Sequence, residues 1–140
     1  MIFEDFIKLG QVRKAKPDIS LAKSLLNYSV KDRELFDAIP VTELSARKLV
    51  SNYYDILRSI LEAISILNGY KIYSHEALTY YLKLIEEDAI SIKFDRLRKI
   101  RNKINYYGEE IKASEAREYI VEIKELADML INKYLKNLRN

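Results

Sequence analysis

The sequence predicts an all-α fold: an up-and-down antiparallel helical bundle of four long helices with one or more short extra helices, in a single domain over residues 1–140. Apolar residues recur at steps of three and four, and no segment alternates with period two for long enough to predict a strand. Gly10, Gly69 and Gly108 each follow such a stretch, at the C′ position where helices commonly end in a left-handed residue. The connections are short, so consecutive helices should pack antiparallel.

Start signals place the first two helices. A short helix is expected at residues 2–9. The next should begin after Asp18, whose carboxylate can accept hydrogen bonds from the free N–H groups of a first turn, and run toward Ile39. Pro17 and Pro40 each precede a new periodic segment, where a missing N–H costs little.

The two middle helices follow from a long apolar stripe and a serine cap. The third helix should run from about Thr42 to Asn68, and its inward stripe is Leu49, Tyr53, Ile56, Ile60, Ile64 and Leu67. Ser74 is expected to cap the fourth helix. The inward residues of that helix are Leu78, Leu82 and Ile85.

Serines are also expected to begin the last two segments. Ser91 should start a fifth segment, with its boundary to the fourth near Ile90. This segment carries Leu97, Ile100, Ile104 and Tyr107. Ser114 should cap the last helix, whose stripe is Ile120, Ile123, Leu130 and Tyr134.

Composition excludes several classes of protein and site. The chain is 49% hydrophobic and 32% charged, which indicates a globular domain. It has no cysteine and one histidine, His75, so disulfides and the usual zinc sites are excluded, and neither a metal nor a cofactor is predicted. No apolar run approaches ~18 residues, and the first ten residues carry Glu4 and Asp5 without a basic region. We therefore expect a cytoplasmic protein with no membrane span and no signal peptide.

A cluster of basic residues near the end of the fifth segment is the main candidate for ligand binding. The net charge of the whole chain is only +3, so the local distribution matters more than the sum. Arg98, Arg101 and Asn105 share one helix face, where they could bind phosphate. The alternative is an ordinary solvated face that nearby acidic residues neutralise. The full cluster is Lys93, Arg96, Arg98, Lys99, Arg101 and Lys103.

Eleven tyrosines and no tryptophan are unusual for 140 residues. Three adjacent pairs occur, at 53–54, 80–81 and 106–107. Adjacent helical residues point ~100° apart, so one tyrosine of each pair should be core and the other exposed or interfacial. The exposed rings suit either a subunit interface or stacking on unpaired bases.

His75 directly follows the expected cap Ser74. The positive end of the helix dipole should lower its pKa, because it disfavours the imidazolium form. His75 is therefore either a general base or a first-turn residue with a local capping role. No nucleophile lies at a suggestive spacing from it in the sequence.

Residues 101–108 read Arg-Asn-Lys-Ile-Asn-Tyr-Tyr-Gly. Together with residues 53–58, 67–71 and 74–78, this stretch resembles the HEPN domain family over roughly residues 44–108. That resemblance implies a prokaryotic helical bundle from a toxin–antitoxin or defence system. It also implies a homodimer that works with a small nucleotidyltransferase encoded alongside.

Family ribonucleases have an arginine, a polar residue directly after it, and a histidine after four to six intervening positions. Arg101 and Asn102 match the first two positions, but the later ones hold Tyr106, Tyr107 and Gly108. Tyrosine, with a pKa near 10, is a poor general base at neutral pH. The resemblance therefore implies a degenerate ribonuclease motif, Arg101, Asn102 and Tyr106, that holds a phosphate better than it cleaves RNA.

The leading hypothesis is a homodimeric protein that binds RNA or a nucleotide where two Arg101-bearing helices meet. The binding residues would be Arg98, Arg101, Lys103 and Asn105. The resemblance also makes Tyr106 and Tyr107 candidates for nucleotide modification or for the interface. The first alternative is a non-catalytic dimeric protein-interaction module. The second is an active metal-independent ribonuclease that uses His75.

Overall fold

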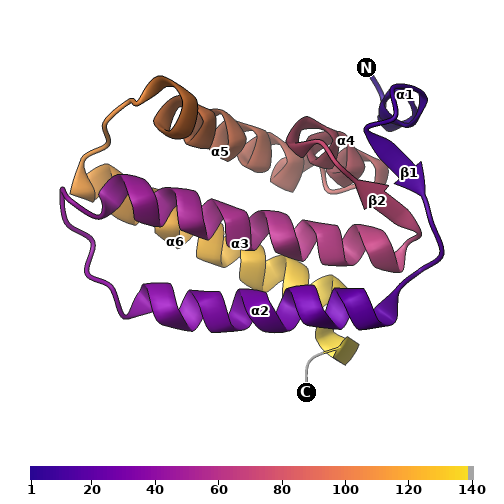
Figure 1. The fold of residues 1–140 in the computed structure, drawn as a ribbon, viewed down its shortest axis with the longest axis horizontal. Helices are drawn as coiled ribbons and strands as arrows, with labels where there is room; N and C mark the ends of the chain where they lie inside the picture. Colours follow the sequence, from indigo (N-terminus) through magenta and orange to yellow (C-terminus); the bar gives the residue numbers. More distant parts are fainter. Residues whose placement is uncertain (139–140) are drawn as a thin grey trace.

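The computed structural model describes residues 1–138 and confirms the helical bundle (Figure 1). Nearly all of its regular structure is helical. The elements in order are α1 (Phe3–Lys8), β1 (Val12–Lys14), α2 (Ile19–Asp37), α3 (Ala46–Leu67), β2 (Tyr70–Ile72), α4 (His75–Leu84), α5 (Asp88–Tyr107), α6 (Ala113–Tyr134) and the 3-10 turn η1 (Lys136–Leu138).

Helix α3 is the centre of the bundle. It packs against α2, α6 and α5, while α4 packs against α5 (Figure 1). Because neighbours cover α3 on several sides, most of its residues are buried, and Leu57, Leu61 and Ala63 are fully buried. Its charged residues, among them Asp55, Arg58 and Glu62, lie on a partly exposed face. Each buried leucine contributes roughly 1.5–3 kcal/mol relative to an exposed one. The predicted inward stripe of this helix is confirmed, with Leu67 only partly buried.

Two three-residue strands, β1 and β2, were not predicted. They pair antiparallel, with Val12 opposite Ile72, and both of these side chains are buried. The backbone N–H of Ala15 donates to the carbonyl of Gly69 at 2.8 Å and extends the pairing. The pairing joins the N-terminal arm to the turn that precedes α4.

The predicted helix signals are partly confirmed. The Asp18 carboxylate accepts from the N–H of Leu21 at 2.9 Å, and Ser74 accepts from Ala77 at 3.3 Å. All three glycines have a positive φ at a helix end: Gly108 is the C-cap of α5, and Gly10 and Gly69 each follow a C-cap residue. The third helix begins at Ala46, not near residue 42, because residues 42–45 form a turn in which Ser45 Oγ accepts from Thr42 N–H at 2.9 Å.

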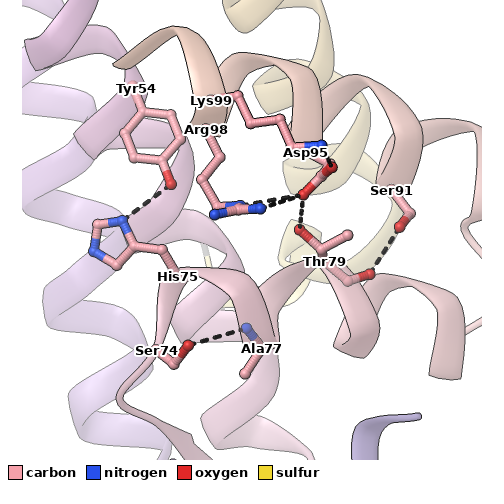
Figure 2. Close-up of polar contacts among 9 residues, drawn as sticks. All are labelled: Tyr54, Ser74, His75, Ala77, Thr79, Ser91, Asp95, Arg98 and Lys99. Carbon is pink, nitrogen blue, oxygen red and sulfur yellow. Dashed lines mark hydrogen bonds and ion pairs between the residues drawn. The ribbon is translucent and has the colours of Figure 1, made fainter. Parts of the chain in front are cut away.

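Two predicted serine caps are wrong. Helix α5 begins at Asp88, and Ser91 lies inside it, fully buried, where its hydroxyl donates to the carbonyl of Thr79 in α4 at 2.8 Å (Figure 2). Helix α6 begins at Ala113, one residue before Ser114. Acidic side chains bind the N–H groups at its start, as Glu43 does for Ala113 at 3.1 Å.

The tyrosine pairs follow the predicted division only in part, at Tyr80 and Tyr81: Tyr81 is fully buried, while Tyr80 is partly buried and packs against the core. The two tyrosines at 53–54 are both buried, since α3 is covered on several sides. Tyr106 and Tyr107, in the last turn of α5, are both exposed, at 69% and 81%.

Candidate functional site

Side chains from three helices converge on one surface of the bundle. We call this group the arginine cluster: Tyr54 and Arg58 from α3, His75 from α4, and Arg98 and Arg101 from α5. Residues three or four apart on one helix lie on the same face, which explains both the α3 pair and the α5 pair. The Ser74 cap fixes the first turn of α4 and so places His75 (Figure 2).

Tyr54 is the buried centre of the cluster. Its ring stacks on Phe94 of α5, with centroids 5.5 Å apart, and its hydroxyl lies 3.1 Å from Nδ1 of His75 (Figure 2). Burial raises the pKa of Tyr54 well above its usual value. The phenol therefore stays protonated and can donate to the imidazole.

Burial and the charges of the three arginines lower the pKa of His75 to about 4. The lowered pKa that the sequence predicted is thus confirmed in direction, with burial and the arginine charges as its causes in the structure. At neutral pH the ring is uncharged. A phenol that donates to Nδ1 leaves the ring proton on Nε2, which makes Nε2–H a donor for an anion.

Nearby carboxylates satisfy only some of the hydrogen-bond donors of these arginines. Arg58 pairs with Glu62 at 2.8 Å, and both Arg58 and Arg101 approach Asp55, at 3.8 and 4.0 Å. Within residues 1–138, the buried Nε atoms of Arg58 and Arg101 have no hydrogen-bond partner. A buried donor without a hydrogen bond costs about 1–3 kcal/mol, so a shift of these guanidinium groups that brought Nε within reach of an anion would recover part of this energy.

Arg101 connects the cluster to the degenerate motif. Its guanidinium lies 5.6 Å from the Tyr54 ring centroid and 5.5 Å from that of Tyr106. Its Nη1 also donates to the Tyr106 hydroxyl at 3.2 Å. The residue that stands where the family motif has histidine therefore contacts the motif arginine, with much of its ring open to solvent.

The other predicted site residues lie differently. Asn102 is half-buried, and the side-chain oxygen of Asn105 accepts from Ser51 of α3 at 2.8 Å, which ties α5 to α3. Lys103 is ~200° around α5 from Arg101 and lines a hollow of about 100 Å³ with Glu109 and other residues. The structure therefore groups Arg98 with Arg101 and Tyr106 but places Lys103 on another side.

Some positive charge of the predicted basic cluster is neutralised. Asp95 pairs with Arg98 at 2.8 Å and with Lys99 at 3.1 Å (Figure 2). Arg96 pairs with Glu122 of α6. The solvated-face alternative thus describes Arg96 and Lys99, while Arg98 also belongs to the arginine cluster.

Sequence reasoning connected His75 with the motif only in the ribonuclease alternative, and it did not connect Tyr54 or Arg58 with the motif. Tyr54 and Arg58 are four residues apart, which places them on one face, but their sequence does not show which helix that face meets. The resemblance used residues 53–58 and 74–78 only as segments of a fold. The packing of α3, α4 and α5 brings them to Arg101.

No protein-family model, curated protein or solved structure that was compared with the chain matches it. The HEPN resemblance therefore stays a prediction from the residues quoted above. Among the described residues, no helix is long and apolar enough to cross a membrane. In the same part of the chain, no group of three or more histidine, cysteine or acidic side chains could hold a metal ion.

Proposed function

We propose that the protein binds a phosphate group of RNA or of a nucleotide at the arginine cluster. The observation that supports this most directly is the meeting of Arg58, Arg98 and Arg101, two of which have buried Nε atoms that make no hydrogen bond within residues 1–138. Guanidinium groups match the geometry of phosphate oxygens and bind them through paired hydrogen bonds. His75 adds a neutral donor, and the exposed Tyr106 ring offers a surface on which a base can stack.

The three cluster arginines face three carboxylates, Asp55, Glu62 and Asp95. These acids hold the guanidinium groups in place without satisfying all their donors. We therefore expect modest affinity that weakens steeply with salt, since each neutralised phosphate releases counterions.

Arg101→Ala tests this function, and Lys103→Ala on the same helix is the matched control. In fluorescence anisotropy with a single-stranded RNA at low salt, Arg101→Ala should weaken binding about 10- to 100-fold, because a charge-assisted hydrogen-bonding group is lost. Lys103→Ala should change the affinity less than about threefold. Equal losses would indicate diffuse electrostatic attraction. No loss in either variant would favour the protein-interaction module.

One observation favours a second function, metal-independent ribonuclease activity. His75 lies among the arginines and supplies the imidazole that position 106 lacks. In its other tautomer Nε2 could take the proton from a ribose 2′-hydroxyl, whose oxygen attacks phosphorus while the 5′-oxygen leaves and takes a proton from water. The hydroxide so formed would then take the proton back from the imidazolium. The products would be a 2′,3′-cyclic phosphate and a 5′-hydroxyl. A pKa near 4 makes a weak base, but a bound phosphate would raise it.

Cleavage in the presence of a chelator separates the two functions. Binding alone predicts little or no RNA cleavage by the natural protein. The ribonuclease predicts cleavage that His75→Gln abolishes while RNA binding remains. Tyr106→His, which restores the family residue beside Arg101, should raise cleavage if the motif geometry is otherwise intact.

We further propose, from the resemblance, that the chain acts as a HEPN-like homodimer in a toxin–antitoxin or defence pair with a nucleotidyltransferase. In such a pair Tyr106 or Tyr107 would receive the nucleotide, and both are exposed. Mass spectrometry after co-expression with a neighbouring nucleotidyltransferase would detect the added nucleotide. The absence of such a gene nearby would count against the pairing.

A further inference from the structure

A groove of about 280 Å³ lies between α2, the C-terminal half of α3 and strand β2. This volume is near the lower end, roughly 300 Å³, of pockets that hold small ligands. Its apolar walls include Leu21 and Leu25 of α2 and Ile66 of α3. Ile72 and Tyr73 close it on the strand side, and Glu62 lines it toward the middle of α3.

Two chain segments connect this groove directly to the arginine cluster. Glu62, at the groove, accepts a hydrogen bond from Arg58 of the cluster at 2.8 Å, and the two residues are one helical turn apart, ~5.4 Å along α3. Tyr73, at the groove, precedes His75 of the cluster by two residues. The groove therefore adjoins the arginine cluster at Glu62 and at Tyr73.

The lining of the groove suits a flat, largely apolar ring with a polar edge. Tyr73 has 61% of its surface exposed, so its ring is available for stacking, while Leu21, Leu25 and Ile66 offer aliphatic contacts. Burial raises the pKa of Glu62, although Arg58 opposes this effect, which indicates that this end of the groove is poorly hydrated. The Glu62 carboxylate can accept from an amino group on the ring edge.

We propose that this groove holds the unpaired base of the nucleotide whose phosphate binds at the arginine cluster. The inference rests on the proposed phosphate binding and adds the ligand class: a nucleotide with a free base, not phosphate alone. The one-turn separation of Arg58 and Glu62 is a distance that a ribose can span. The cluster supplies the charge that complements the phosphate, and the groove supplies the surface for the base.

The experiment uses adenosine 5′-monophosphate, ribose 5-phosphate and inorganic phosphate as probes of the full chain. All three should perturb the NMR signals of the Arg58 and Arg101 side chains. Only the nucleotide should perturb the methyl signals of Leu21, Leu25 and Ile66. The nucleotide should also bind roughly tenfold more tightly than ribose 5-phosphate, because stacking adds to phosphate binding.

Tyr73→Ala is the informative variant. Its control is Tyr28→Ala, which removes another exposed tyrosine. Tyr73→Ala should weaken nucleotide binding roughly fivefold or more and leave ribose 5-phosphate binding unchanged. Tyr28→Ala should change neither. If the nucleotide binds no better than ribose 5-phosphate and leaves the groove methyls unperturbed, the base site is wrong while phosphate binding stands. If none of the probes perturbs the arginines, the proposed function fails, and the base site with it.

Discussion

His75 makes the stability of the protein depend on pH in a definable window. Its pKa is about 4 in the folded chain against 6.5 for the free side chain, so between these values the unfolded chain binds more protons. Stability should therefore fall as the pH falls from 6.5 to 4. The loss should be about 1 kcal/mol, since solvent screens the half-exposed ring.

Urea unfolding at pH 7.5 and pH 4.5, with His75→Gln for comparison, measures this contribution. Glutamine does not titrate, so the variant should lose about 1 kcal/mol less between the two pH values. The carboxyls of Asp37, Glu87 and Asp95, whose pKa values are lowered in the fold, also cost stability as the pH falls. They do so in both proteins and cancel in the difference. An equal pH dependence in the two proteins would contradict the assignment to His75.

Asp95 limits how much positive charge the cluster can offer a ligand. Burial on its own raises the pKa of its carboxyl, but hydrogen bonds from Arg98 and Lys99 outweigh burial and hold the pKa below its usual value. Asp95→Asn should release both cations and tighten RNA binding roughly threefold to tenfold at low salt.

Glu122→Gln is the matched control for Asp95→Asn. It releases Arg96, which is also on α5 but pairs with α6 and is not part of the arginine cluster. RNA affinity at low salt should then change less than about twofold. If both variants tighten binding equally, overall charge and not the cluster governs the affinity.

At the scale of elements, the turn between α3 and β2 depends on a glycine. Gly69 has a φ of +85°, and a Cβ at this position would lie 2.9 Å from the carbonyl oxygen of Ala15. Gly10 has a similar φ of +75° but open space around its Cα. Gly10→Ala should lower the free energy of unfolding by about 1 kcal/mol, because alanine disfavours the left-handed backbone. Gly69→Ala should cost about 3 kcal/mol, because it also separates the two strands.

Urea denaturation midpoints of the two glycine variants check this difference. Similar losses would mean that the chain near Ala15 moves aside at little cost. A selective loss at Gly69 should also loosen the N-terminal arm, which hydrogen exchange of the Ala15 amide would detect, since that amide donates to the Gly69 carbonyl.

Helix starts were predictable where the cap is local. Asp18 and Ser74 bind N–H groups three residues ahead, so the signal and its target lie in the same short segment. Ser91 failed because its hydroxyl binds a carbonyl of the neighbouring helix α4. The strands were missed for a related reason: Val12 and Ile72 pair across 60 residues, and three residues are too few to show period two.

At the scale of the whole molecule, part of the candidate site was predictable from the sequence and part was not, again because of how far apart in sequence the contacting residues lie. Arg98, Arg101 and Tyr106 were predictable because one helix carries them all. Adding Arg58 and His75 requires the rotation of α3 and α4 against α5. That rotation is set by contacts distant in sequence, such as Tyr54 on Phe94 and Ser51 with Asn105. No periodicity within a single helix encodes these pairings.

The predicted homodimer is also a property of the whole molecule. The exposed C-terminal end of α5 is where we expect its interface. Tyr106, which contacts Arg101, and its neighbour Tyr107 place two large aromatic side chains in solvent, and aromatic residues are enriched in subunit interfaces. A two-fold axis near this point would pair each tyrosine patch with itself and bring the two Arg101 side chains toward one another. Phosphates of one RNA could then contact both chains.

Sedimentation equilibrium at micromolar concentration should therefore give about twice the chain mass of 16.5 kDa. Tyr107→Arg should weaken the dimer at least about tenfold, because it replaces an aromatic contact with a charge that meets its own copy across the axis. Tyr28 is also an exposed tyrosine, but it lies on α2. Tyr28→Arg is an equally drastic change and should leave the mass unchanged. If the natural protein sediments as a monomer, the two-chain site is wrong and RNA binds at one arginine cluster. The salt dependence of the RNA affinity should then reflect the phosphate contacts of a single chain.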